Sequence, residues 1–523
     1  MKPLWSLFLT ALTIINIQNI SYADQVTHKE ALDRANKSVK EVSKDIVSSK
    51  FYPTYHFASP ANLLLEPSGF VYFNGEYHLF YRQNPFSLEQ SKMFIGHSVS
   101  PDLLHWKNQP FALAPSEEYD ELNIYSGSAI VEDNLLYLMY TGDKENNIEG
   151  YKEVKETQNL AISKDGINFG KSANNAVIKI APHYSGMTFS SEKFRSPYVW
   201  KQGDKYYALI GSQFQITKDG AVVLYKSDDL RNWIFVNVTA IGNKGEMGDM
   251  WETPQLAKIE ENDLLIISTS GIKTDNKKFR NKHNSGYFIG KLDYNSGKFK
   301  QKGAFELFDY GFDFYAPQVI KTDDSKNVLI ALLDMPDTNT KKTPDWAGTM
   351  TIPREITICE DKVITKPLKT LEQLRTEPVY YKNQKINGKK ILPQIFGSTY
   401  ELELQADLTH TNKFSVKLRV SETQETTISY DKTAGVLLLN RDKSSNEDYN
   451  IKGQREVSLP LTNNSLKLQI FVDKSSIEIF ANDGQAVLSS RIYPDDDAID
   501  VVFMSDGDAK LNYLNYYKLK SIR

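Results

Sequence analysis

The feature that most constrains the fold is a strand–turn–strand pattern that the chain repeats from about residue 60 onward. In each copy a small or turn residue opens an apolar strand, a short polar turn follows, and a second, more apolar strand returns. The turns contain Asn-Gly, Glu-Asp, Gly-Asp, Glu-Asn and Asp-Asp pairs, which carry residues that reverse a chain. The five copies are PSGFVYFNGEYHLFY, SGSAIVEDNLLYLMY, SPYVWKQGDKYYALI, TPQLAKIEENDLLIIS and APQVIKTDDSKNVLIALL.

A second signature recurs between these copies as SPDLLHW, SKDGINF and SDDLRNW, each with Ser-x-Asp, a turn and an aromatic residue. We interpret these segments as outer hairpins of the same units. Units of several strands at a spacing of roughly 60 to 70 residues are typical of β-propellers. The sequence therefore predicts an all-β fold with a five-bladed β-propeller over residues 52–365. A large β-sandwich is the alternative, but it does not explain the second signature.

The residues at the heads of the five hairpins are predicted to share one site. In a propeller the first strand of each blade lines the central channel. Residues far apart in the sequence would therefore converge on one axial funnel, which is the arrangement that a two-carboxylate active site needs. The residues at these heads are Glu66, Ser126, Ser196, Glu252 and Tyr315.

Two segments are expected before the propeller. Lys2, the apolar run LWSLFLTALTIINI and the small residues around Ala23 are typical of a signal peptide over residues 1–23, which predicts a secreted or periplasmic protein. An uncleaved membrane anchor is the alternative, although the run is short for a span. Residues 24–51 are predicted to be helical, with a capping box from Thr27 to Glu30. We expect the apolar face of this helix to pack on its own protein in preference to a coiled-coil partner; the face comprises Leu32, Ala35, Val39, Val42 and Ile46.

The pattern changes after the fifth repeat. Residues 366–380 are predicted to be a linker, and the alternating strands of residues 381–523 a β-sandwich without a catalytic cluster. This second domain would stabilise the propeller or bind carbohydrate. Cys359 is the only cysteine, so an intrachain disulfide is excluded. The formal net charge of −4 gives no sign of a nucleic acid or an anionic membrane as partner.

Several ordered motifs resemble glycoside hydrolase family 32, the family of invertases, levanases and inulinases. The opening segment HFASPANLLLEPSGFVYFNGEYHLFYRQNP is similar to the region where that family has a Trp-Met-Asn-Asp-Pro-Asn-Gly motif. The resemblance covers about residues 52 to 523 and implies a five-bladed propeller followed by a sandwich. The other matching motifs are SGSA, FRSP, WETP, DFYA, DWAGTMTIPRE and LQIFVDKSSIEIFANDG.

The resemblance implies retaining hydrolysis of β-fructofuranosides without a metal or cofactor. One carboxylate attacks the anomeric carbon and a second carboxyl protonates the leaving oxygen. It places Glu252 at the acid/base position and Glu66 at the nucleophile position, and a carbohydrate is the expected ligand. Asp313 would orient the acid or satisfy backbone donors, and the Trp346 motif lies close to the site although such a residue is more often core. The residues expected to bind substrate are Arg195, Ser196, Arg82, Ser126, Asp313 and Trp346.

The same resemblance predicts a modified fructose pocket. Glu66 stands where the family has Asp, and its extra methylene moves the carboxylate by about an ångström, which can cost roughly 100-fold in rate. Ser196 stands where the family has the Asp of an Arg-Asp-Pro motif, so a charged acceptor for sugar hydroxyls is lost. Arg82 stands where Gln is usual, and it would pair with Glu66 or bind an acidic sugar. Leu65, Ile95 and Thr253 also depart from the family pattern.

Three functions are compatible with these residues. The first is a glycosidase that uses Glu252 as acid and Glu66 as nucleophile or base, on a fructan, sucrose or a related glycoside. The second is a carbohydrate-binding protein with impaired catalysis, for which Arg82 and Ser196 are the signs. The third is a structural or adhesive secreted protein, in which the two glutamates are solvated charges at strand ends.

Overall fold

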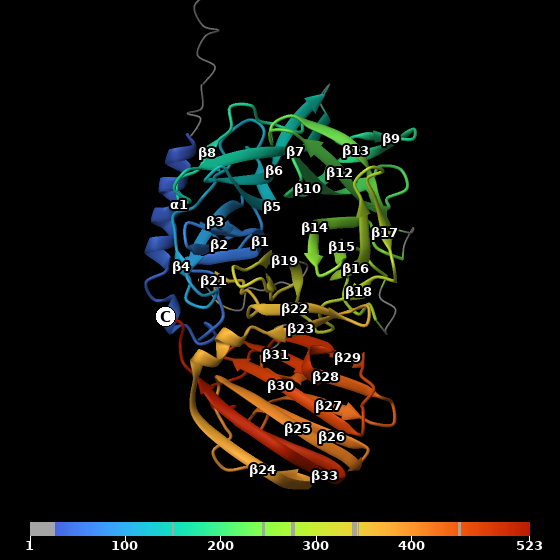
Figure 1. Cartoon of the computed structure of the whole chain (residues 1–523). Helices are drawn as coiled ribbons and strands as arrows, with labels where there is room; N and C mark the ends of the chain where they lie inside the picture. The colour runs from blue at the N-terminus through green and yellow to red at the C-terminus, as the bar shows by residue number, and fades with distance from the viewer. Residues whose placement is uncertain are drawn as a thin grey trace, which may run out of the picture.

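The computed structural model describes residues 27–148, 151–242, 246–273, 278–336, 343, 345–447 and 451–523. The predicted signal peptide, residues 1–23, lies outside the described residues. Figure 1 shows a propeller with a β-sandwich stacked against one of its sides. The predicted fold class, an all-β chain with a five-bladed propeller and a C-terminal sandwich, is confirmed.

The propeller has five sheets around one axis, and each predicted strand–turn–strand copy forms an antiparallel pair of inner strands in one sheet. The late strand β21 pairs in parallel with β1 and thereby joins the end of the propeller to its first blade. The strands are β1 (Asn62–Phe73), β2 (Glu76–Asn84), β3 (Phe94–Ser100), β4 (Lys107–Asn108) and β21 (Trp346–Ala347) in blade 1; β5 (Asn123–Glu132), β6 (Leu135–Ile148), β7 (Tyr151–Ser163) and β8 (Gly170–Lys171) in blade 2; β9 (His183–Tyr184), β10 (Met187–Gln202), β11 (Lys205–Phe214), β12 (Gly220–Ser227) and β13 (Trp233–Ile241) in blade 3; β14 (Met250–Ile259), β15 (Asn262–Ser270), β16 (His283–Asp293), β17 (Lys298–Gln301) and β18 (Glu306–Leu307) in blade 4; and β19 (Tyr315–Lys321), β20 (Asn327–Leu332), β22 (Arg354–Cys359) and β23 (Lys362–Pro367) in blade 5.

Local sequence chemistry explains both repeated signatures. The β1–β2 turn has positive φ at Asn74 and Gly75, 49° and 86°, which is the conformation that an Asn-Gly hairpin turn favours. The Ser-x-Asp signature follows the third strand of blades 1, 2 and 3. In blade 1 the Asp102 carboxylate accepts hydrogen bonds from the backbone N–H groups of Leu104 and His105 and so closes an Asx turn.

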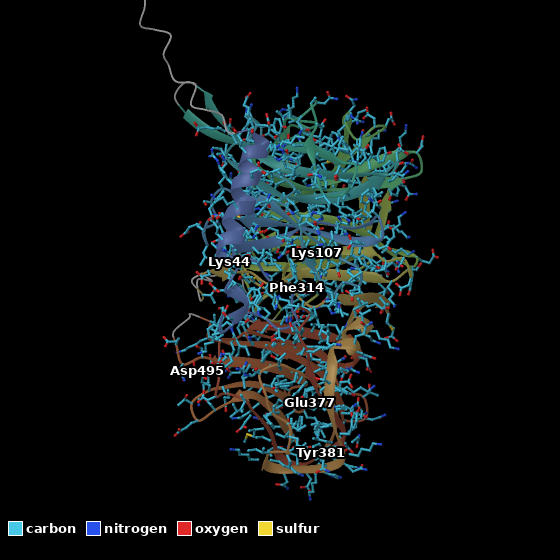
Figure 2. The ribbon with its side chains drawn as sticks, turned by 90° about the vertical axis from the view of Figure 1, so that its left-hand side faces the viewer. Lys44, Lys107, Phe314, Glu377, Tyr381 and Asp495 are labelled. Atoms are coloured by element: carbon cyan, nitrogen blue, oxygen red, sulfur yellow. The ribbon has the colours of Figure 1, made fainter. Side chains whose placement is uncertain are left out.

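The N-terminal helix α1 (His28–Val42) packs along the outside of blade 1, as Figure 2 shows. Its predicted capping box is present: Glu30 N–H donates to Thr27 Oγ1, and Thr27 N–H donates back to the Glu30 carboxylate. Ala31 and Ala35 are buried against Phe94 and its neighbours. The helix therefore covers its own protein, as expected, and is followed by a single turn of 3₁₀ helix, η1 (Ile46–Ser48).

The sandwich is a single ten-stranded sheet that folds around an apolar core, which includes Leu404, Val416 and Phe503. The predicted linker, residues 366–380, differs from the structure. The 3₁₀ helix η2 (Lys369–Leu374) connects the domains, and β24 begins at Arg375 because its backbone pairs with the last strand of the chain. The strands are β24 (Arg375–Lys390), β25 (Tyr400–His410), β26 (Lys413–Val420), β27 (Glu425–Asp431), β28 (Val436–Lys443), β29 (Gln454–Ser458), β30 (Ser465–Asp473), β31 (Ser476–Ala481), β32 (Ala486–Arg491) and β33 (Asp500–Leu519), with a 3₁₀ turn, η3 (Asn482–Gly484), before β32.

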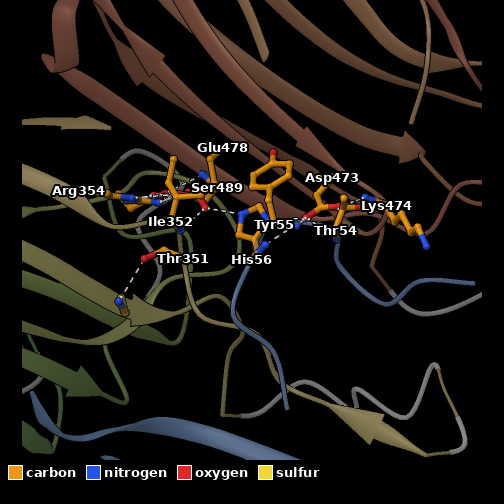
Figure 3. Close-up of polar contacts among 12 residues, drawn as sticks. Thr54, Tyr55, His56, Thr351, Ile352, Arg354, Asp473, Lys474, Glu478 and Ser489 are labelled. Atoms are coloured by element: carbon orange, nitrogen blue, oxygen red, sulfur yellow. Dashed lines mark hydrogen bonds and ion pairs between the residues drawn. The ribbon is translucent and has the colours of Figure 1, made fainter. Parts of the chain in front are cut away.

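A buried polar network joins the two domains (Figure 3). The His56 ring lies between two carboxylates of the sandwich, with Nδ1 at 2.8 Å from Asp473 and Nε2 at 2.9 Å from Glu478. Arg354 of blade 5 donates from Nε to Glu478 and from Nη1 to Asp309, each at 3.0 Å. All these side chains are inaccessible to water, so the contact between the domains is fixed by charged groups as well as by apolar packing.

Candidate active site

Six residues predicted for the site line one cavity of about 190 Å³, at the end of the propeller where the five inner strands begin. The inner strands β1, β5, β10, β14 and β19 each contribute to its wall. Tyr315, from the head of the fifth hairpin, lines it too. The convergence expected from the hairpin heads is therefore present in the structure. The six residues are Glu66, Arg82, Ser126, Arg195, Ser196 and Glu252.

A β-bulge in every inner strand directs these side chains. The pairing register shifts between Leu64 and Pro67 in β1, and between Glu252 and Gln255 in β14. The same interruption occurs near the start of β5 and β19, and in the middle of β10 after Arg195. A bulge bends the strand and re-aims a side chain. Ser196 and Thr253 have positive φ, 62° and 44°, a costly conformation for residues with a Cβ that the surrounding structure must maintain.

Glu252 has two partners that favour its ionised form. Arg195 Nη1 lies 3.3 Å from Glu252 Oε1, and the Tyr315 hydroxyl donates to Oε2. Burial raises the pKa of Glu252, but the charge of Arg195 and the hydrogen bond from Tyr315 outweigh it, so this pKa is lower than usual. Burial and the neighbouring Glu252 in turn raise the pKa of Tyr315 well above its ordinary value. Both partners therefore favour the carboxylate form of Glu252.

Glu66 forms an ion pair with Arg82, whose Nη1 donates to Glu66 Oε1 at 3.0 Å. Arg82 is held from two other directions: its Nε donates to the Ile124 carbonyl at 3.1 Å, and its guanidinium lies 4.5 Å from the centre of the Tyr125 ring. Of the two roles expected for Arg82, pairing with Glu66 is the one that the structure shows. A carboxylate engaged in this way is a weaker nucleophile than a free one.

Glu156 is a buried carboxyl at the site that sequence reasoning missed. Its Oε1 lies 2.8 Å from Arg195 Nε, and its Oε2 accepts a hydrogen bond from Phe194 N–H at 2.5 Å. Burial raises the pKa of Glu156 to about 8, although Arg195 opposes the shift. Glu156 lies in the middle of β7, away from any hairpin head. Its only sequence signal is a charged residue directly before the less polar run Thr157 to Ile162 of the same strand.

Two expected substrate-binding residues are elsewhere. Asp313 is fully buried and its carboxylate binds Arg441 and Arg491 of the sandwich. It therefore satisfies donors at the domain interface, and both of its oxygens are engaged by arginine groups. Trp346 packs edge-on against Tyr52 in the core between α1 and blade 1 and lines a different, smaller cavity. Asp313 thus faces the sandwich, and Trp346 faces the N-terminal segment, instead of the cavity.

Comparison with known families gives this arrangement an identity. Models of the N-terminal domain and of the C-terminal part of glycosyl hydrolases family 32 match residues 56–367 and 370–518. The chain belongs to glycosyl hydrolase family 32. The family resemblance expected from the motifs is confirmed.

Relatives within family 32 match nearly the whole chain. A sucrose-6-phosphate hydrolase from Bacillus subtilis is 33% identical over 92% of this chain and 98% of its own length. A raffinose invertase from Escherichia coli is also 33% identical, over 92% and 98% of the two chains. The solved β-fructofuranosidase of Bombyx mori superposes with a TM-score of 0.82 at 31% identity, covering 94% of this chain and 99% of that one.

Within the described residues, no three His, Cys, Asp or Glu side chains are grouped so that they could hold a metal ion. In the same part of the chain, no helix has both the length and the apolar character needed to cross a membrane.

Proposed function

We propose that this family 32 member hydrolyses the glycosidic bond of a β-fructofuranoside, with Glu66 as nucleophile and Glu252 as proton donor. The observation that carries the proposal is that both carboxyls line one cavity of about 190 Å³, on strands β1 and β14. Two carboxyl groups at one sugar site are the minimal apparatus of a retaining glycosidase. The names of relatives, which include sucrose-6-phosphate hydrolases and an invertase, support this class of substrate.

The two ion pairs predict how the reaction rate would depend on pH and on the charge of the substrate. Glu252 must be protonated to act as acid, and its pKa is lower than usual, so we expect the rate to fall as the pH rises from the acid range. The Glu66 carboxylate must separate from Arg82 before it can attack the anomeric carbon. A sugar that gives Arg82 another acceptor, such as a phosphate or carboxylate group, would release Glu66, so anionic fructosides are included among the substrates to be tested.

The test is turnover of sucrose, sucrose-6-phosphate, raffinose, levan and inulin by the purified chain and by a Glu252→Gln variant. We expect release of fructose from at least one substrate, retention at the anomeric carbon, and a rate at least on the order of 100-fold lower in the variant. Absence of product from all five substrates at high protein concentration would refute the hydrolase proposal.

A second function is favoured by one specific contact, the 3.0 Å pair between Glu66 and Arg82. If this pair persists with a sugar bound, the protein is a carbohydrate-binding homologue with impaired catalysis. Calorimetry then shows fructoside binding without turnover, and Glu252→Gln leaves the affinity unchanged.

We also propose that the chain is exported through its N-terminal segment, as the signal-peptide pattern of residues 1–23 predicts. N-terminal sequencing of the protein recovered from the periplasm or medium tests this proposal, with a mature start near Asp24 expected.

A further inference from the structure

A carboxyl of blade 2 reaches into the segment of blade 3 that carries the site. Glu156 lies on β7, and only 3% of its surface is exposed. One of its oxygens is ion-paired with Arg195 Nε at 2.8 Å, and the other accepts the Phe194 N–H at 2.5 Å. A single side chain therefore fixes both the backbone and the guanidinium of this segment.

Gln158, two residues along the same strand, holds the same segment from beside Glu156. Its Nε2 donates to the Phe194 carbonyl at 2.6 Å, and its Oε1 accepts from Thr141 Oγ1 at 2.7 Å. Thr141 Oγ1 in turn accepts the Ser196 N–H at 2.9 Å. Ser196 has a φ of 62°, so the segment keeps a costly conformation that neighbouring groups must maintain.

The contact with Glu156 extends to Glu252 through one rigid group. The guanidinium of Arg195 is planar, with its donors at fixed angles. Its Nε forms an ion pair with Glu156 at 2.8 Å, although the N–H does not point at the oxygen, and its face lies 4.4 Å from the centre of the Tyr125 ring. Together with the hydrogen bond from Nη2 to the Glu192 carbonyl at 2.8 Å, these contacts direct Nη1 to within 3.3 Å of Glu252 Oε1.

The charged groups around Glu156 come from three strands. Arg195 of β10 and Asp143 of β6 face it, and Glu252 of β14 acts on it from farther away. Burial raises the pKa of Glu156 to about 8, which shows that its ionised form is costly there. A costly buried carboxyl against an active-site arginine is a feature of functional sites.

We propose that Glu156 is a positioning residue: its carboxyl holds the Arg195 guanidinium in place against Glu252. This inference rests on the proposed function only in assigning proton donation to Glu252. Without the Glu156 carboxyl, the Arg195 guanidinium can turn away from Glu252, and the ionised form of Glu252 then loses part of its stabilisation.

The test compares Glu156→Gln and Glu156→Asp with the unchanged protein in kcat, KM and the pH profile of kcat/KM. We expect Gln to lower kcat by roughly 10- to 100-fold, more than it raises KM, because Arg195 loses its fixed direction. We also expect the basic limb of the profile to move to higher pH, because an Arg195 that turns away no longer lowers the pKa of Glu252. Asp keeps the carboxyl group but reaches less far, so kcat falls and the basic limb lies between those of the unchanged protein and Glu156→Gln.

Two control variants distinguish the effect of the Glu156–Arg195 contact from the effect of removing a nearby charge and from a general loss of structure. Asp143→Asn removes a neighbouring buried carboxyl that acts on Arg195 only through its charge, with no hydrogen bond or ion pair between them among the described residues, so a much smaller shift of the basic limb is expected. Glu153→Gln alters a more exposed carboxylate of β7 that binds Ser191, and neither kcat nor the profile should change.

An unchanged kcat together with an unchanged basic limb in Glu156→Gln would overturn the inference. If the unchanged protein turns over no substrate, the proposed function fails instead. Crystal structures of the two proteins then decide the inference. Loss of the Arg195–Glu252 contact in Glu156→Gln supports it, and an Arg195 that stays within hydrogen-bond distance of Glu252 refutes it.

Discussion

At the scale of single residues, the site is defined by which arginine each carboxylate binds. Glu66 has Arg82 at 3.0 Å, and Glu252 has Arg195 at 3.3 Å together with the Tyr315 hydroxyl. The two guanidinium groups also lie 4.5 and 4.4 Å from the centre of one ring, that of Tyr125. The chemistry of the cavity therefore depends on how readily a sugar separates Glu66 from Arg82.

Replacing Arg82 by Gln is expected to raise kcat on sucrose roughly tenfold. The charged hydrogen bond to Glu66 is worth about 1.5 kcal/mol or more, and its loss frees the nucleophile. Steady-state kinetics on both proteins measure the effect. A fall in kcat would mean that Arg82 acts on the substrate.

A matched variant for this prediction is Arg375→Gln in the sandwich. Arg375 also pairs with a buried glutamate, Glu401, at 2.7 Å, but it lies far along the chain in the second domain. It should reduce thermal stability without raising kcat.

At the scale of elements, the bulges of the inner strands depend on close contact with the strands behind them. Gly211 of β11 faces β14 so closely that a Cβ built on it would lie 2.1 Å from the Trp251 carbonyl. Trp251 directly precedes Glu252 in the bulged part of β14. A glycine is required at position 211 because the backbone of the neighbouring blade occupies the space of a side chain.

The Gly211→Ala variant is expected to lose about 1–3 kcal/mol of unfolding free energy and most of its activity. The methyl group must push β14 away, and Glu252 moves with it. Thermal unfolding and kcat measure the two effects. Gly170→Ala is the control, because no atom lies within 4 Å of its Cβ and its φ is ordinary, so both quantities should stay almost unchanged.

At the scale of the whole molecule, buried charges hold the propeller and the sandwich in one arrangement. His56 lies between Asp473 and Glu478, and Asp313 is held by Arg441 and Arg491. Burial lowers the pKa of His56, but hydrogen bonds and charge from the two carboxylates outweigh burial and raise it to about 9. The interface is therefore most stable when this histidine is charged.

The stability of the whole protein is expected to fall between pH 6.5 and about 9. His56 has a folded pKa of about 9 and an ordinary value of 6.5, so its contribution is complete below 6.5 and is lost as the pH rises through 9. The loss is about 3 kcal/mol. Thermal midpoints across this range measure it.

The variants for this prediction are His56→Asn and His105→Asn. His56→Asn is expected to be less stable at pH 6.5, because it removes the cation beside buried Asp473 and one of the two cations beside buried Glu478, and to lose this part of the pH dependence. His105 is partly exposed on blade 1, and its replacement should leave the pH dependence intact. A His56→Asn variant with the same slope as the unchanged protein would contradict the assignment.

The sequence by itself determined the blades, the hairpin turns, the helix cap and the convergence of Glu66, Ser126, Ser196 and Glu252 on one cavity. These features follow from patterns within one strand pair, where alternation of apolar residues and turn chemistry decide which side chain faces inward. The paired carboxyls of the site could be found in this way because each opens a blade.

Only the tertiary structure decided the partners of those residues. Glu156 of β7 pairs with Arg195 of β10, and Arg82 pairs with Glu66. Asp313 faces the sandwich and not the cavity. Each of these contacts crosses from one strand, blade or domain to another. Periodicity within a strand specifies the face on which a residue lies, but the residue that it meets there depends on how separate sheets pack.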